Sequence, residues 1–304
     1  MHTPQALKVG DIVAIPAPAR AVRPEDMEPA IQTLESWGLR VQLTPNLYGR
    51  HLGFSGTDAQ RIRDLQDCLD DPEVKAILCA RGGYGTLRIV DGLDFKAFRK
   101  NPKWVVGFSD LTALHASIYD QKVVSIHGPM AYSWNGRTAN PEAILGLKKA
   151  LFGERIQYAC SANSPEFTLP GSAVGRLIGG NLSLVSQIIG TPTQWDAKNA
   201  ILFIEDLSEH LYHIDRMMVH LKRSGLLDGL AGMIVGGFTD LKPDEPPFGM
   251  DVAEIIHEKV KDLGIPLCFG FPTGHWPDNY PLLHGGLAKL NVSHAHTELL
   301  FIDR

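Results

Sequence analysis

Short apolar runs alternate with amphipathic stretches through the first half of the chain. In one such stretch Met27, Ile31 and Leu34 recur four and three positions apart, which predicts one face of a helix. The short apolar runs predict buried strands over 11–15, 40–43, 75–80, 104–107 and 123–126. Strands that alternate with helices predict a parallel sheet covered by helices on both faces.

The second half has a different pattern. It again contains short apolar runs, and the last two predicted strands follow each other without a helix between them. The strands predicted here are 200–204, 233–236, 266–270, 287–292 and 298–302. The segment 153–171 loses periodicity and gains Pro and Ser, as linkers do. We therefore expect an N-terminal doubly wound α/β domain over 1–152, a linker over 153–172 and a C-terminal mixed α+β domain over 173–304.

Composition narrows the class of protein. The 304 residues are 44% hydrophobic and 21% charged, as in globular domains, and the net charge of −5 disfavours a nucleic-acid-binding surface. None of the four cysteines forms a CxxC pair, which disfavours a disulfide scaffold. Lys8 and Asp11 interrupt any secretory signal, and polar residues interrupt the longest uncharged run, 177–195. We expect a cytoplasmic protein with no membrane or nucleic-acid partner.

The sharpest local signal is the segment 104–115, WVVGFSDLTALH. A predicted strand ends at Gly107, and Ser109 lies in the turn before a helix, where free N–H groups stabilise developing negative charge. This resembles a nucleophile elbow, although Leu111 stands where the G-x-S-x-G pattern has glycine. The alternative is that Ser109 is only the N-cap of the helix.

A glycine-rich loop, CARGGYG, follows the third predicted strand at 79–85. It fits neither a dinucleotide-binding fingerprint nor a phosphate-binding P-loop. Three glycines allow close backbone approach, so the loop is a candidate oxyanion hole, with a tight turn as the alternative. Arg81 in this loop is a candidate for binding an anion or for pairing with a surface acid.

Two further side chains complete a possible catalytic set. Glu205 follows a strand directly, and His275 lies in a loop framed by Gly and Pro. Ser109, Glu205 and His275 are a nucleophile, an orienting acid and a base, each at or just after the end of a predicted strand. The remaining histidines lack zinc-site spacing, so we expect no metal. A triad from both halves of the chain predicts an active site between two domains.

The chain resembles the L,D-carboxypeptidase family of serine peptidases, the murein tetrapeptide carboxypeptidases, whose broader family includes the microcin C immunity peptidases. The resemblance extends over nearly the whole chain in eight ordered blocks. These blocks are APA at 17–19, RGGYG at 81–85, GFSD at 107–110, IHGP at 126–129, GRLIGGNL at 175–182, IED at 204–206, GGFTD at 236–240 and GH at 274–275.

The resemblance implies a triad of Ser109, Glu205 and His275, an oxyanion hole from Asp110 and Gly83, no cofactor, and a homodimer. It implies release of terminal D-alanine from murein tetrapeptides during peptidoglycan recycling. The absence of a long insertion favours this activity over hydrolysis of acyl-nucleotide conjugates, as by the immunity peptidases. A non-catalytic small-ligand binding protein is the alternative from another class.

Four residues are candidates for substrate contacts. The substrate is anionic, so Arg81 or Arg216 could hold a carboxylate. Asn181, in the GGN turn, could hydrogen-bond the peptide backbone, and Tyr84 lies in the glycine-rich loop.

Overall fold

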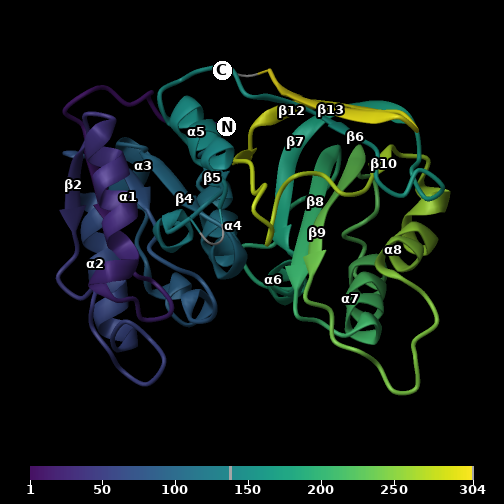
Figure 1. The fold of residues 1–304 in the computed structure, drawn as a ribbon, viewed down its shortest axis with the longest axis horizontal. Coiled ribbons are helices and arrows are strands. Elements are labelled where there is room, and N and C mark those ends of the chain that lie inside the picture. Colours follow the sequence, from purple (N-terminus) through teal and green to yellow (C-terminus); the bar gives the residue numbers. More distant parts are fainter. Residues whose placement is uncertain (137–138, 303–304) are drawn as a thin grey trace. The chain divides into compact units, whose positions relative to one another are not determined.

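The computed structural model describes residues 1–136 and 139–302. The chain divides into two compact units, each with its own sheet (Figure 1). The first unit comprises Met1–Glu154 and Pro277–Leu283, and the second comprises Arg155–Trp276 and the chain from His284 onward. This confirms the expected fold class, a mixture of α/β and α+β architecture.

The first sheet is doubly wound, and its pairs among β1 to β5 are all parallel, as predicted. Its strand order is β2 (Arg40–Leu43), β1 (Ile12–Ile15), β3 (Val74–Leu78), β4 (Trp104–Gly107), β5 (Ser125–His127) and β11 (Leu282–His284). The α-helices of this unit are α1 (Pro24–Ser36), α2 (Asp58–Asp70), α3 (Lys96–Lys100), α4 (Thr112–Asp120) and α5 (Pro141–Leu151). Short 3₁₀ helices are η1 (Thr86–Arg88), η2 (Val90–Gly92), η3 (Ser109–Leu111) and η4 (Ala131–Trp134).

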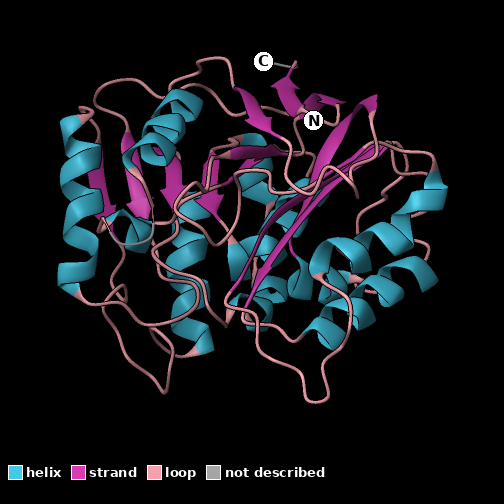
Figure 2. Cartoon of the chain, turned by 45° about the vertical axis from the view of Figure 1, so that its right-hand side comes forward, coloured by secondary structure: helices cyan, strands magenta, loops and turns pink. Residues whose placement is uncertain are grey.

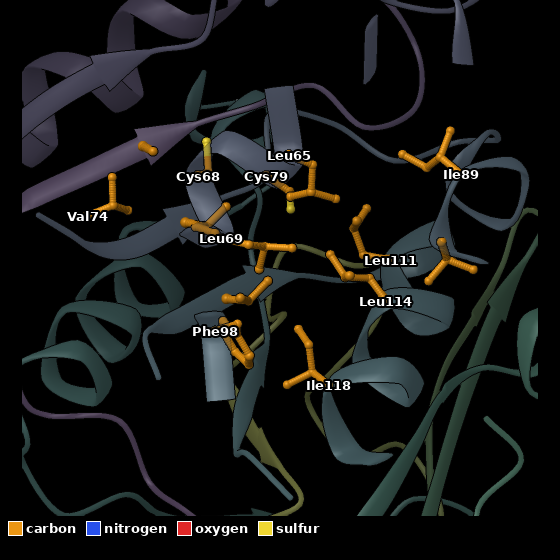
Figure 3. Packing of buried hydrophobic residues seen from close by; sticks show 14 of the residues in the cluster. Leu65, Cys68, Leu69, Val74, Cys79, Ile89, Phe98, Leu111, Leu114 and Ile118 are labelled. Atoms are coloured by element: carbon orange, nitrogen blue, oxygen red, sulfur yellow. The ribbon is translucent and has the colours of Figure 1, made fainter. Parts of the chain in front are cut away.

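The core of the first unit lies between its sheet and the helices α2, α3 and α4 (Figure 3). Leu65, Phe98 and Leu114 from these three helices are fully buried in it. The Cys79 side chain also lies in this core, and burial raises the pKa of its thiol. A buried, protonated thiol is a poor nucleophile, which argues against Cys79 as the attacking group.

The strand order reverses between β1 and β3, because β2 lies on one side of β1 and all later strands lie on the other. The loops that follow β1 and β3 start side by side, since Ala80 N–H donates to the Pro16 carbonyl at 2.8 Å. In open α/β sheets, ligands bind outside the carboxyl ends of the strands at such a switch point. The loops 16–20 and 79–85 are therefore the expected walls of a binding site.

Arg61 of α2 holds these two loops together. Its side chain is fully buried, and its Nη1 group donates to the carbonyls of both Pro18 and Gly85. Its charge is balanced by Asp58, whose carboxylate lies 2.5 Å from Nη2. One buried guanidinium thus joins the loop after β1 to the loop after β3.

We expect Arg61→Met to lower the free energy of unfolding by about 3 kcal/mol, because it leaves two carbonyls without their donor and removes a buried ion pair. Denaturant unfolding followed by circular dichroism measures this effect. Arg63→Met is the matched control, since Arg63 is exposed on the same helix and should change the free energy by less than about 0.5 kcal/mol. Equal effects of the two substitutions would contradict the linking role of Arg61.

The second sheet is half parallel and half antiparallel. It is parallel from β7 through β10 and antiparallel from β7 through β12 and β13 to β6. Its order is β10 (Leu267–Cys268), β9 (Gly232–Thr239), β8 (Ala200–Leu207), β7 (Gly171–Asn181), β12 (Leu287–Val292), β13 (His296–Phe301) and β6 (Gln157–Ser161). The helices of this unit, which gather beside the long strands in Figure 2, are α6 (Leu182–Ile188), α7 (Leu211–Arg223), α8 (Val252–Val260) and η5 (Lys261–Leu263).

The structure differs from the predicted boundaries at two places. The segment 153–172, predicted as a linker, contains β6, which pairs with β13 and so belongs to the second sheet. The segment Pro277–Leu283, predicted to lie in the C-terminal domain, belongs to the first unit. In the part of the chain that the structure describes, no helix is long and apolar enough to cross a membrane.

Candidate active site

Ser109 lies in a sharp turn between a strand and a helix. β4 ends at Gly107, η3 begins at Ser109, and α4 follows at Thr112. Ser109 has a φ of +63°, a left-handed conformation that is strained for a residue other than glycine. The N-cap residues of η3 and α4 are Phe108 and Leu111, so Ser109 caps neither helix. The observed turn favours the nucleophile elbow over the N-cap.

Packing and a buried histidine hold the end of β4 in place at Gly107. A Cβ at Gly107 would lie 2.8 Å from Leu111 Cγ, so this position accepts only glycine without rearrangement. The Gly107 carbonyl accepts from His115 Nε2 at 2.8 Å, and His115 Nδ1 then accepts from the Ser125 hydroxyl at 2.8 Å. Burial lowers the pKa of His115 to about 4, so the ring is neutral and structural.

The glycine-rich loop packs directly on the elbow. A Cβ at Gly82 would lie 3.4 Å from the Phe108 carbonyl oxygen and 3.5 Å from Asp110 Cβ. The Asp110 carboxylate accepts from both the amide and the hydroxyl of Thr86, at 2.8 and 2.7 Å. Burial raises the pKa of Asp110, while these hydrogen bonds oppose the rise. Gly83 and Asp110, predicted as oxyanion-hole residues, thus lie on adjoining segments of the first unit.

In the second unit the structure brings together Glu205 and His275, which are 70 residues apart in the chain. His275 Nδ1 lies 2.5 Å from Glu205 Oε2. Glu205 is fully buried and lies inside β8 at a register shift between Ile204 and Asp206, rather than after the strand as expected. A bulge of this kind re-aims a side chain, here toward His275.

Glycines make the approach of these two residues possible. A Cβ at Gly274, where φ is +104°, would lie 2.6 Å from Glu205 Cβ and 2.8 Å from Oε2. A Cβ at Gly236 would lie 2.6 Å from the Thr273 carbonyl oxygen and 3.3 Å from Glu205 Cβ. Gly236 of the GGFTD block and Gly274 of the GH block are therefore required by close packing around the pair.

The pair sets the protonation of the imidazole. An ionised carboxylate only accepts, so Nδ1 carries a proton and Nε2 is the nitrogen that can take one from a nucleophile. Burial opposes protonation of the ring, but Glu205, with smaller effects of Asp206 and Asp240, raises the pKa of His275 above its ordinary value.

Asp206 anchors the strand next to the pair. Its carboxylate accepts from Asn181 Nδ2 at 2.8 Å, from the backbone of Leu207 at 2.8 Å, and from the amide and hydroxyl of Ser183 at 2.9 and 2.8 Å. Burial and the neighbouring Glu205 raise its pKa to about 6. Asn181 also accepts from Leu184 N at 3.3 Å, so its side-chain amide is directed at this network.

The other candidate contacts are dispersed over both units. The Arg81 guanidinium stacks 4.2 Å from the centre of the Tyr132 ring, and Tyr84 is half exposed with its ring 5.9 Å from that of Phe54. Arg216 is exposed on α7. Among the described residues, no group of three or more His, Cys, Asp or Glu side chains is arranged to hold a metal ion.

An elbow serine beside a glycine-rich loop, and a buried carboxylate paired with an imidazole, are the parts of a serine hydrolase. Residues 13–128 match the LD-carboxypeptidase N-terminal domain, and residues 174–290 match the LD-carboxypeptidase C-terminal domain. The chain belongs to this family, and it is a hydrolase, a carboxypeptidase of the serine type.

Individual relatives cover nearly the whole chain. A probable murein peptide carboxypeptidase of Bacillus subtilis is 36% identical over 96% of this chain and 92% of its own length. The crystal structure of a muramoyltetrapeptide carboxypeptidase from Oxalobacter formigenes superposes with a TM-score of 0.87 at 30% identity, over 96% of this chain and 99% of that one. An MccF-like protein from Bacillus anthracis, 24% identical over 99% of this chain and 100% of that one, has the same fold with a TM-score of 0.87.

Sequence reasoning did not assign roles to three residues that build the site. Arg61, His115 and Asp206 are buried and hold the loops or strands that carry the candidate catalytic groups. Asp206 stands in the IED block and His115 ends the segment 104–115, but nothing local distinguishes a buried anchoring residue from a catalytic one. Arg61 lies in an ordinary amphipathic helix, where an arginine is usually exposed.

Proposed function

We propose that this protein hydrolyses the L,D-peptide bond that releases terminal D-alanine from murein tetrapeptides, with Ser109, His275 and Glu205 as its catalytic triad. The catalytic part rests on the hydrogen bond of 2.5 Å between His275 Nδ1 and Glu205, which directs Nε2 toward proton transfer. The substrate rests on the murein carboxypeptidases that the chain resembles over almost its full length.

The proposed reaction has two steps. His275 Nε2 takes the Ser109 hydroxyl proton while Oγ attacks the scissile carbonyl carbon, and the imidazolium then gives that proton to the departing amine of D-alanine. Water, deprotonated by His275, attacks the resulting ester and restores the serine. Glu205 holds the imidazole in the required tautomer and stabilises the imidazolium.

The negative charge that develops on the carbonyl oxygen in the transition state is stabilised by backbone N–H donors. We assign these to the N–H groups of Gly83 and Asp110, because the two segments adjoin at the elbow; each such donor contributes about 3 kcal/mol to lowering the barrier. We assign Arg81 and Arg216 to carboxylates of the substrate, and Tyr84 to its peptide. Asn181, a candidate for the same contact, is buried and its side-chain amide is bonded to Asp206 and Leu184, so we assign it to holding the strand instead.

Incubation with a murein tetrapeptide, read by mass spectrometry, tests the proposal, and loss of one D-alanine is the expected result. An acyl-sulfamoyl nucleotide in a parallel incubation tests the immunity-type activity, which the fold alone does not separate from the first. A serine-directed phosphonate separates both activities from a non-catalytic binding protein, because only an activated Ser109 reacts with it. Cleavage of the nucleotide conjugate alone, or no labelling, would overturn the proposal.

The proposal also covers the localisation and the oligomeric state of the enzyme. Murein peptides that are recycled are processed inside the cell, so we place the protein in the cytoplasm. We also propose a homodimer, as the family resemblance implies, which sedimentation analysis would test.

The pH dependence of the proposed reaction follows from the Glu205–His275 pair. The base must be neutral in the free enzyme, so kcat/KM should rise with pH through the pKa of His275, which Glu205 holds above the ordinary value of about 6.5. Glu205→Gln removes the negative charge and should move this rise to lower pH while reducing kcat/KM. Profiles of kcat/KM from about pH 5 to 9 measure both effects; an unmoved rise in the variant would exclude His275 as the base.

A further inference from the structure

Arg20 lies in the loop that follows β1, at the switch point of the first sheet. Its side chain packs against Gly83 of the loop that follows β3. A Cβ added at Gly83 would lie 2.7 Å from Arg20 Cδ and 2.9 Å from Nε, so only glycine leaves room for this contact. The next glycine, Gly82, packs on the elbow of Ser109. Arg20 therefore contacts the residue next to the one that packs on the turn of Ser109.

The backbone that carries Arg20 is held in place. Ser55 N–H donates to the Ala19 carbonyl at 3.2 Å, and Ala21 N–H donates to the Gly53 carbonyl at 3.3 Å. These two hydrogen bonds flank Arg20 and pair it with Phe54 in an antiparallel β-bridge. The Ser55 hydroxyl also donates to Ala17 at 2.5 Å. A fixed backbone beneath an exposed side chain is suited to presenting one charged group in a defined place.

Three arginines near Arg20 are paired with carboxylates. Arg61 and Arg88 both pair with Asp58, at 2.5 and 2.8 Å, and Arg23 pairs with Asp26 at 3.0 Å. Arg20 forms no ion pair with any carboxylate among the residues that the structure describes. An exposed guanidinium without a carboxylate partner, carried by a loop at the switch point of the sheet, is available for an anion.

We propose that Arg20 binds the terminal carboxylate of the substrate and so makes the enzyme a carboxypeptidase. This inference rests on the proposed function. In such a substrate only the amide nitrogen and one α-carbon separate the scissile carbonyl carbon from the carboxylate carbon. If the carbonyl oxygen accepts from Gly83 N–H, the carboxylate has to lie within a few bonds of Gly83, where the Arg20 side chain is. An internal peptide bond would place a neutral amide there and lose this contact.

The test compares two substrates that differ only at that group: a tetrapeptide ending in D-alanine and the same peptide ending in D-alaninamide. Wild type should prefer the free acid in kcat/KM. Arg20→Met should reduce kcat/KM for the acid by about 10- to 100-fold and leave the amide almost unchanged, as expected for one charge-assisted contact. Arg20→Lys, which keeps the charge but not the two-pronged geometry, should retain part of the preference.

Arg50→Met is the matched control, because Arg50 is also exposed in the first unit and its loss changes the net charge equally. It should leave the preference for the acid intact. Where turnover of the amide is too slow to follow, inhibition by D-alanine against D-alaninamide measures the same contact, and Arg20→Met should lose the preference for the acid that wild type and Arg50→Met show. An unchanged preference in Arg20→Met, or no preference in wild type, would overturn the assignment. Failure of wild type to release D-alanine from either peptide would instead overturn the proposed function.

Discussion

Ser109→Ala is expected to reduce kcat on a murein tetrapeptide by at least about 10⁴-fold, because no other group can form the acyl intermediate. The fold should be retained. Alanine at a φ of +63° carries much the same backbone strain as serine, and the substitution removes a single oxygen atom. Mass spectrometry of the product and denaturant unfolding of the variant measure the two effects separately.

A control variant and a labelling experiment show whether the loss of activity is due to the hydroxyl of Ser109. Ser36→Ala, at the exposed end of α1, removes the same atom and should keep wild-type turnover. The phosphonate should label wild type and Ser36→Ala but not Ser109→Ala. Turnover of Ser109→Ala near the wild-type rate would reject the nucleophile, whatever the identity of the substrate.

The sequence predicted the first unit well because its elements are short and sharply bounded. β2 and β4 occupy the predicted residues, and Thr57 caps α2 through a reciprocal exchange with Gln60, a T-x-x-Q pattern that is readable in the sequence. Parallel strands buried on both faces give continuous apolar runs, and helices between them give a different period, so both are visible in one sequence.

β7 was not predicted, although it is among the longest strands. Its sequence, GSAVGRLIGGN, contains four glycines and lacks a clear alternation, so it resembles a loop. The structure explains Gly179, since a Cβ there would lie 1.9 Å from the Phe203 carbonyl oxygen of β8. Close backbone approach between neighbouring strands therefore accounts for a residue type that normally argues against a strand.

One part of the candidate site could be predicted from local sequence, and the other part could not. The elbow at Ser109 has a local signal, because strand, turn and helix are consecutive in the chain. The pairing of Glu205 with His275 joins a residue inside β8 to a loop residue 70 positions later, and periodicity carries no information about which segments meet. The combination was predicted only from the requirements of a triad and from the family resemblance, and the return of 277–283 to the first unit had no signal at all.

Gly274→Ala should reduce kcat/KM by about 10³- to 10⁴-fold without removing any catalytic group. The added methyl group would lie 2.6 Å from Glu205 Cβ and 2.8 Å from its carboxylate, so Glu205 and His275 can no longer keep a separation of 2.5 Å. An imidazole without its carboxylate loses both its tautomer and the stabilisation of its charged form. The pH profile should report this directly, with the rise of kcat/KM moved to lower pH as in Glu205→Gln.

Gly264→Ala is the control for backbone strain. Gly264 also has a positive φ, +69°, and an added Cβ there would meet no atom within 4 Å. Both substitutions should lower the free energy of unfolding by about 1 kcal/mol through strain alone, and Gly274→Ala by more through the overlap with Glu205. Only Gly274→Ala should lose activity among the molecules that remain folded at the assay temperature. If both variants kept the wild-type rate and pH profile, the close packing of Glu205 against His275 would not be what makes the imidazole a base.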